Sequence, residues 1–205
     1  MQRRIAWFAA LLALVLVMAA CAPVPAGPAA GQPAGEAPAA ATGPKTLTIA
    51  TGTDIENMNI HVVTSSPSFS VLEHVYETLF YMNEEGELEP LLAESIEPGE
   101  DGSTFILKLR EGVSFSDGTP FNAEAVKANL EWVLNPDNSA TFAFLIDQID
   151  TITAVDDYTV EITLKSDFAP LPAHLSHGAL AMVAPSALEQ GADFLAANTI
   201  GTGPY

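Results

Sequence analysis

The sequence predicts an α/β protein in which helices pack against a mixed β-sheet. Three observations predict it. Several segments alternate apolar and polar residues, as half-buried strands do. Others repeat apolar residues at three- and four-residue spacing, as amphipathic helices do. The two kinds of segment follow one another without strict strand–helix–strand alternation, which favours a mixed sheet over a purely parallel one.

The first 20 residues predict a secretory signal peptide. Arg3 and Arg4 precede an uncharged apolar run over residues 5–18, and small residues lead directly into Cys21. The segment 17–21, VMAAC, resembles a bacterial lipobox, which implies that a diacylglycerol is attached to Cys21 and that this residue becomes the first of the mature chain. An ordinary signal peptide with an incidental Cys, or an uncleaved anchor, are the alternatives.

Residues 21–44 predict a disordered tether. They are almost entirely Ala, Pro and Gly, show no apolar periodicity and cannot bury a core. As a flexible coil this segment would span roughly 25–30 Å. A lipid on Cys21 and a folded body from residue 45 would then be joined by a flexible arm.

The charge of the chain excludes some partners. It has 7 Lys and Arg residues against 26 Asp and Glu residues, a net charge of −19, and this acidity repels nucleic acid and anionic lipid surfaces. The simplest interpretation is that acidity keeps an exported protein soluble. A preference for cationic solutes is the sharper alternative. Cys21 is the only cysteine, so no internal disulfide forms.

The body is expected to contain the following elements in order. Residues 46–50 form a strand, 51–59 a polar loop, and 67–80 an amphipathic helix with Ser66 as its N-cap; 83–86 form a turn. Residues 104–110 form a strand that the hairpin signal Asp101-Gly102 precedes. Asn122 caps a helix that ends at Asn135-Pro136. Strands at 151–155 and 159–165, a helix at 168–176, a strand at 180–184 and a helix at 185–190 stopped by Gly191 complete the chain.

Five segments resemble one protein family. They are LTIATGTD at 47–54, VYETLF at 75–80, ELEPLLAES at 87–95, DGSTFILKLREGVSFSDGTPFNAEAV at 101–126 and IGTGPY at 200–205. In this order and spacing they resemble the family 5 solute-binding proteins, the oligopeptide, dipeptide and nickel type. The long middle segment is specific, whereas the others are weak singly.

The resemblance implies a fold of the periplasmic-binding-protein type II kind. Residues 45–74 would start lobe one, 75–190 would form an inserted subdomain, and 191–205 would re-enter lobe one. Family members run to more than twice this length, so the chain is expected to lack the second lobe. The signature at 101–126 would be scaffold, with Asp117 in a turn rather than at a ligand.

The resemblance also implies a function. The protein would be an anchored receptor outside the cytoplasm, a monomer without cofactor, that captures peptides or similar small solutes and delivers them to ABC permease subunits. Candidate ligand contacts lie on loops near the expected hinge. They are Thr51, Gly52, Thr53, Asp54, Tyr76, His174, His177 and Tyr205.

Other interpretations of these residues stay open. Asp54 could meet a ligand amine, but a turn-forming Asp is the preferred interpretation. His174 and His177 are spaced to share one helical face, but two ligands do not make a metal site, so none is assigned. A surface-anchored hydrolase has no G-x-S-x-G elbow to support it. A structural surface domain would be expected to show repeats, and none is visible.

Overall fold

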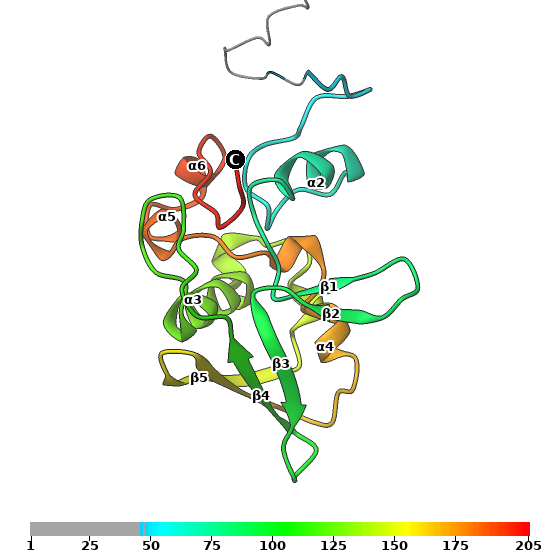
Figure 1. Cartoon of the computed structure of the whole chain (residues 1–205), viewed down its shortest axis with the longest axis vertical. Coiled ribbons are helices and arrows are strands. Elements are labelled where there is room, and N and C mark those ends of the chain that lie inside the picture. The colour runs from blue at the N-terminus through cyan, green and yellow to red at the C-terminus, as the bar shows by residue number, and fades with distance from the viewer. Residues whose placement is uncertain (1–45, 47) are drawn as a thin grey trace, which may run out of the picture. The chain divides into compact units, whose positions relative to one another are not determined.

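A four-stranded antiparallel sheet lies at the centre of the body. The computed structural model describes Thr46 and residues 48–205, and Ile49–Tyr205 form one unit (Figure 1). The sheet has the order β3-β4-β6-β5, with β3 at Ala93–Pro98, β4 at Thr104–Leu109, β5 at Ile149–Asp156 and β6 at Thr159–Leu164. The strands expected at 104–110, 151–155 and 159–165 are confirmed. Each pairing between described strands is antiparallel rather than mixed, because hairpins join β3 to β4 and β5 to β6.

Helix α3, Ala123–Leu134, packs against β5 and β6 of this sheet. Asn122 caps it as expected, since its side-chain oxygen accepts a hydrogen bond from the N–H of Ala125 at 3.0 Å. Val126, Leu130 and Val133 are buried between helix and sheet. On β4 the alternation expected from the sequence holds, because Phe105, Leu107 and Leu109 are buried.

The helix expected at 67–80 is wrong in length. Helix α2 runs only from Ser66 to Leu72, and its N-cap is Ser65 rather than Ser66. The chain then turns, because the carbonyl of Val75 accepts a hydrogen bond from the N–H of Gly203 instead of continuing the helix. The apolar spacing nevertheless has a cause: buried core positions follow the helix in the turn and in β1. They are Tyr76, Leu79 and Phe80.

A short hairpin follows α2. Strands β1, Phe80–Met82, and β2, Leu88–Pro90, pair around the turn expected at 83–86. The side-chain oxygen of Asn83 accepts hydrogen bonds from the N–H groups of Glu85 and Glu87, and Gly86 has φ 80°. These features fix a hairpin that lies at the edge of the body in Figure 1.

From Pro136 to the end of the chain, the segments outside β5 and β6 contain only short turns of helix. They are η2 at Pro136–Asn138, η3 at Ala143–Leu145, α4 at Leu171–His174, η4 at Gly178–Leu180, α5 at Pro185–Leu188 and α6 at Ala192–Leu195. The helix expected at 168–176 is therefore a single turn. The helix expected at 185–190 is confirmed in a shorter form, and Gly191, with φ 83°, ends it.

The strand expected at 180–184 is wrong, although the segment is buried. Its backbone is paired irregularly instead of in a ladder. Met182 donates to the carbonyl of Glu77, Ala184 donates to the carbonyl of Ile200, and Val183 exchanges hydrogen bonds with the side chain of Asn129. A side chain from α3 thus replaces the neighbouring strand.

The strand expected at 46–50 is not found at the residues described there. Thr46 and residues 48–50 are exposed and pair with no described strand, and an extended segment without a partner forms no ladder. The signal peptide, the tether and Cys21 lie outside the described residues. Among Thr46 and residues 48–205, no helix is long and apolar enough to cross a membrane.

Candidate functional site

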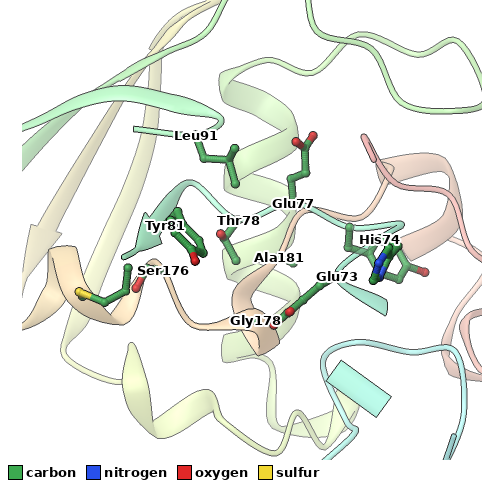
Figure 2. A pocket seen from close by; sticks show the side chains of 11 residues that line it. Glu73, His74, Glu77, Thr78, Tyr81, Leu91, Ser176, Gly178 and Ala181 are labelled. Carbon is green, nitrogen blue, oxygen red and sulfur yellow. The ribbon is translucent and has the colours of Figure 1, made fainter. Parts of the chain in front are cut away.

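A groove of about 520 Å³ opens between the chain that leaves α2 and the chain that links α4 to η4 (Figure 2). We call it the first groove. The N–H of Met182 donates to the carbonyl of Glu77 and so joins the two segments beneath it. The lining residues come from α2 through β2 and from 176–181. They are Glu73, His74, Tyr76, Glu77, Thr78, Tyr81, Met82, Leu91, Ser176, Gly178 and Ala181.

A second groove, of about 450 Å³, adjoins the first. The two share Glu73, Met82, Ser176 and Gly178, so they form neighbouring parts of one depression. The second groove extends along α2 to Ser66, Phe69 and Ser70, and along α4 to Ala173 and His177.

Phe69 and His177 line the second groove and pack with Phe142, which lines neither groove; we call the three rings the aromatic cluster. The ring of His177 lies 4.6 Å from that of Phe142 and 5.7 Å from that of Phe69, centroid to centroid. The two phenylalanine rings are 6.0 Å apart in an edge-to-face arrangement. Phe144, which is 62% exposed, lies 5.9 Å from Phe142 and extends the cluster to the surface.

Gly178 allows this close approach. A Cβ at this position would lie 3.1 Å from Cδ1 of Phe69 and 3.4 Å from Oε1 of Glu73. Figure 2 shows the side chain of Glu73 extending toward Gly178. Because Gly178 has no side chain, the ring of Phe69 and the carboxylate of Glu73 can both lie against its backbone.

Burial shifts the pKa of two residues at these grooves. Partial burial, together with the nearby His174, lowers the pKa of His177, so its ring is neutral at pH 7. Burial raises the pKa of Tyr76 to about 12, and its hydroxyl points to the carbonyl of Met58 at 3.4 Å rather than to solvent. Tyr76 therefore forms a wall of the first groove without offering it a free hydroxyl.

The candidate residues from the sequence are only partly brought together. His177 lines the second groove and Tyr76 the first, whereas His174 lines neither; its Nδ1 lies 2.6 Å from the carbonyl of Leu145. Tyr205 is 81% exposed, with its ring 6.2 Å from that of His74. The loop residues Thr51, Gly52, Thr53 and Asp54 are exposed and line neither groove.

Several groove residues have no counterpart among the sequence candidates. Glu73 and Tyr81 flank the segment VYETLF, so that segment was a usable signal for them. Phe69 fits the apolar pattern of the helix expected at 67–80, and its packing partner Phe142, which lines neither groove, lies in a stretch without periodicity. Their meeting depends on tertiary structure alone.

The grooves lack positive charge. The four Lys and Arg residues of the described chain line neither groove, and each contacts another group. Lys108 donates to Thr159, Lys165 to the carbonyl of Asp147 and Arg110 to the carbonyl of Leu91, and Lys127 lies 4.0 Å from Glu131. Within residues 48–205, no three His, Cys, Asp or Glu side chains gather as metal ligands would. The grooves therefore offer aromatic faces, carboxylates and backbone groups.

The signature turn at 117–120 lies apart from the grooves and joins other elements. The carboxylate of Asp117 accepts hydrogen bonds from Thr119 and from the hydroxyl of Ser186, at the start of α5. The N–H of Ser116 donates to the carbonyl of Gly201. These bonds hold the signature turn to α5 and to the C-terminal segment.

Solved structures define the class of protein. NikA from Brucella suis, in complex with Fe(III)-EDTA, matches with a TM-score of 0.65 and 36% identity over 74% of this chain and 30% of its own. AgaA from A. tumefaciens R10, in complex with agropinic acid, matches with a TM-score of 0.69 and 28% identity, over 74% and 30%. The fold is that of the type II periplasmic binding proteins, as expected from the sequence.

Sequence comparison defines the family. The model for bacterial extracellular solute-binding proteins, family 5 Middle, matches residues 87–205. The glutathione-binding protein GsiB of Escherichia coli K12 is 38% identical over 161 residues, which are 78% of this chain and 31% of GsiB. The chain belongs to the family 5 solute-binding proteins, which are not enzymes. It spans about a third of the length of the curated relatives it matches.

Proposed function

We propose that this protein is the receptor of an ABC importer, which captures a peptide or a similar small solute outside the cytoplasm and passes it to the permease. Family membership over residues 87–205 carries the proposal. Relatives named for glutathione, and matching structures that hold agropinic acid or a metal chelate, support a small polar solute.

The two grooves are the surface that we assign to the solute. Ligand sites are concave and largely apolar, with a few polar groups that fix orientation. The first and second grooves fit this description, because the rings of Phe69 and His177 lie there with the carboxylate of Glu73 and the half-buried Gly178. Loop residues 51–54 and Tyr205 stay secondary candidates.

The remainder of the site would come from a second lobe. A groove on one lobe becomes a closed site when the other lobe bends over it at a hinge. In this arrangement residues 45–74 and 191–205 belong to the first lobe and 75–190 to the inserted subdomain. We therefore expect the 205-residue chain alone to bind solute weakly. Micromolar binding of a peptide library to this chain in titration calorimetry would contradict the expectation.

Uptake by cells tests the proposed function. The chromosomal gene is deleted and restored, and entry of labelled glutathione, tripeptides, an opine and nickel–histidine is measured. We expect deletion to abolish uptake of at least one solute. In the restored strain Phe69→Ala, at a ring that lines the second groove, should lower that uptake about tenfold, since an aromatic contact in a binding site is worth about 1–3 kcal/mol. Val155→Ala, at an exposed residue outside both grooves, is the control. Uptake of every solute unchanged by deletion would refute the proposal.

Attachment of lipid at Cys21 is a separate part of the proposal. Labelling with palmitate should mark the wild-type protein and leave Cys21→Ala unlabelled. The variant should also leave the membrane fraction, because the anchor supplies the membrane affinity. A Cys21→Ala variant that still takes the palmitate label, or a wild-type protein that takes none, would contradict lipid attachment at Cys21.

A further inference from the structure

Glu73 occupies the junction of the two grooves. It lines both, its side chain is exposed, and within the described chain its carboxylate takes no hydrogen bond or ion pair. A carboxylate in a depression without a partner is free to accept hydrogen bonds from a ligand.

The end of α2 strengthens the negative potential at this residue. Glu73 is the C-cap of the helix, whose last turn has no basic residue. The carbonyl groups of the last turn of α2 accept hydrogen bonds from residues 73–76, and the partial negative charge at this end of the helix still favours cations. A carboxylate at this position is unfavourable for the helix itself, so the local field and the side chain attract the same kind of ligand.

Aromatic faces lie beside the carboxylate. Phe69 precedes Glu73 by four residues and so shares its side of α2. His177 and Phe142 complete the aromatic cluster, and the ring of His177 is uncharged at neutral pH because its pKa is lowered. Neutral rings attract a cation over their faces, and a charged imidazole would repel it.

No positive side chain of the described residues neutralises the site. Arg110 comes nearest, through its bond to the carbonyl of Leu91 in the first groove, but it does not line the groove. The other three described Lys and Arg residues contact groups elsewhere. Glu77 adds a second carboxylate to the first groove.

We propose that Glu73 and the aromatic cluster bind a cationic group of the solute, an ammonium or a guanidinium. The carboxylate accepts its N–H groups while Phe69 and His177, which line the second groove and pack against Phe142, cover its charge. The inference rests on the proposed function and narrows the solute to one that presents a cation to this wall. Glutathione presents a single ammonium beside two carboxylates, so it should bind this site more weakly than a peptide with two cationic groups.

Binding to the receptor purified from its native membrane tests the inference. The probes are Ala-Lys-Ala, which has two ammonium groups, N-acetyl-Ala-Gln-Ala, which has none, and glutathione. We expect Ala-Lys-Ala to bind tightest. Glu73→Gln should weaken its binding about tenfold, because a charge-assisted hydrogen bond becomes a neutral one. If N-acetyl-Ala-Gln-Ala binds at all, its affinity for Glu73→Gln should stay within about twofold of its affinity for the wild type.

The matched control is Glu84→Gln, which removes one carboxylate from the exposed turn 83–86, outside both grooves. Glu84→Gln should leave the affinity for every probe unchanged, and both variants should have the melting temperature of the wild type. Equal binding of Ala-Lys-Ala by wild type and Glu73→Gln would overturn the inference and leave the proposed function intact. If no probe binds, the inference fails, and the uptake assay still decides the proposed function.

Discussion

Replacing Gly201 by Ala should disrupt the contact between the C-terminal segment and the turn after α2 and so destabilise the fold. A Cβ at this position would overlap the carbonyl oxygen of Val75 and lie 2.8 Å from Cδ1 of Tyr76. Neither neighbour can move easily. The first is backbone, and the second is the ring of a buried side chain.

The cost follows from the kind of atoms that collide. An extra methyl group in a packed interior costs about 1–3 kcal/mol, and more where the backbone must shift. We expect about 3 kcal/mol for Gly201→Ala. For a domain of this size, 1 kcal/mol lowers the melting temperature by about 2–4 °C, so the variant should melt about 6–12 °C below the wild type.

Calorimetric and urea-induced unfolding of the chain measure this effect. Gly52→Ala is the matched control, because a Cβ there meets no atom within 4 Å and no left-handed backbone is required. It should change the free energy of unfolding by less than about 1 kcal/mol. A Gly201→Ala variant that melts within about 2 °C of the wild type would refute the packing described for this contact.

Three further predictions concern buried or hydrogen-bonded groups. Burial lowers the pKa of His61 from 6.5 to about 4, so as the pH falls the unfolded chain protonates this residue before the folded chain does. The free energy of unfolding present above pH 6.5 should therefore drop by up to about 3 kcal/mol by pH 4 in urea unfolding, and His61→Gln should flatten this dependence of stability on pH. Asn129→Ala removes bonds to Ala125 and Val183 and should lower the free energy of unfolding by about 2–4 kcal/mol, whereas Asn198→Ala, at an exposed site, should cost under 1 kcal/mol. Ser186→Ala should raise the lowered pKa of Asp117 in an NMR titration; an unchanged titration would contradict the bond between them.

Three of the four strands of the central sheet were predicted, because their signals are local, whereas β3 at Ala93–Pro98 was not expected. Alternation marked strands β4, β5 and β6, and Asp101-Gly102 marked the hairpin between β3 and β4. Likewise, Asn122 predicted the start of α3, because its own side chain caps the helix. Each of these features depends on neighbours a few residues away, which a sequence pattern records.

The errors occurred where distant backbone decides the conformation. The apolar spacing continued past Leu72, but the bond from Gly203 to Val75 bends the chain there. The segment 180–184 looked like a strand because it is buried, and Asn129 satisfies its backbone instead of a neighbouring strand. Periodicity reports burial, and it does not report which partner takes the hydrogen bonds.

The site was predicted less well than the fold. His177 and Tyr76 line the grooves, whereas loop residues 51–54 do not. Phe69 and Phe142 come together only because α2 and the region of η3 meet in space. Neither residue differs in sequence from an ordinary core phenylalanine, so no local pattern could single them out.

The contact of Gly201 and Gly203 with the turn after α2 sets an order for folding. The hairpins β3–β4 and β5–β6 join near neighbours and close quickly, whereas this contact joins residues more than a hundred positions apart. The segment after α2 that lines the grooves therefore reaches its final conformation only when residues 201–203 have packed against it. A chain crossing a membrane from its N-terminus would keep the solute surface unformed until that late segment has been delivered.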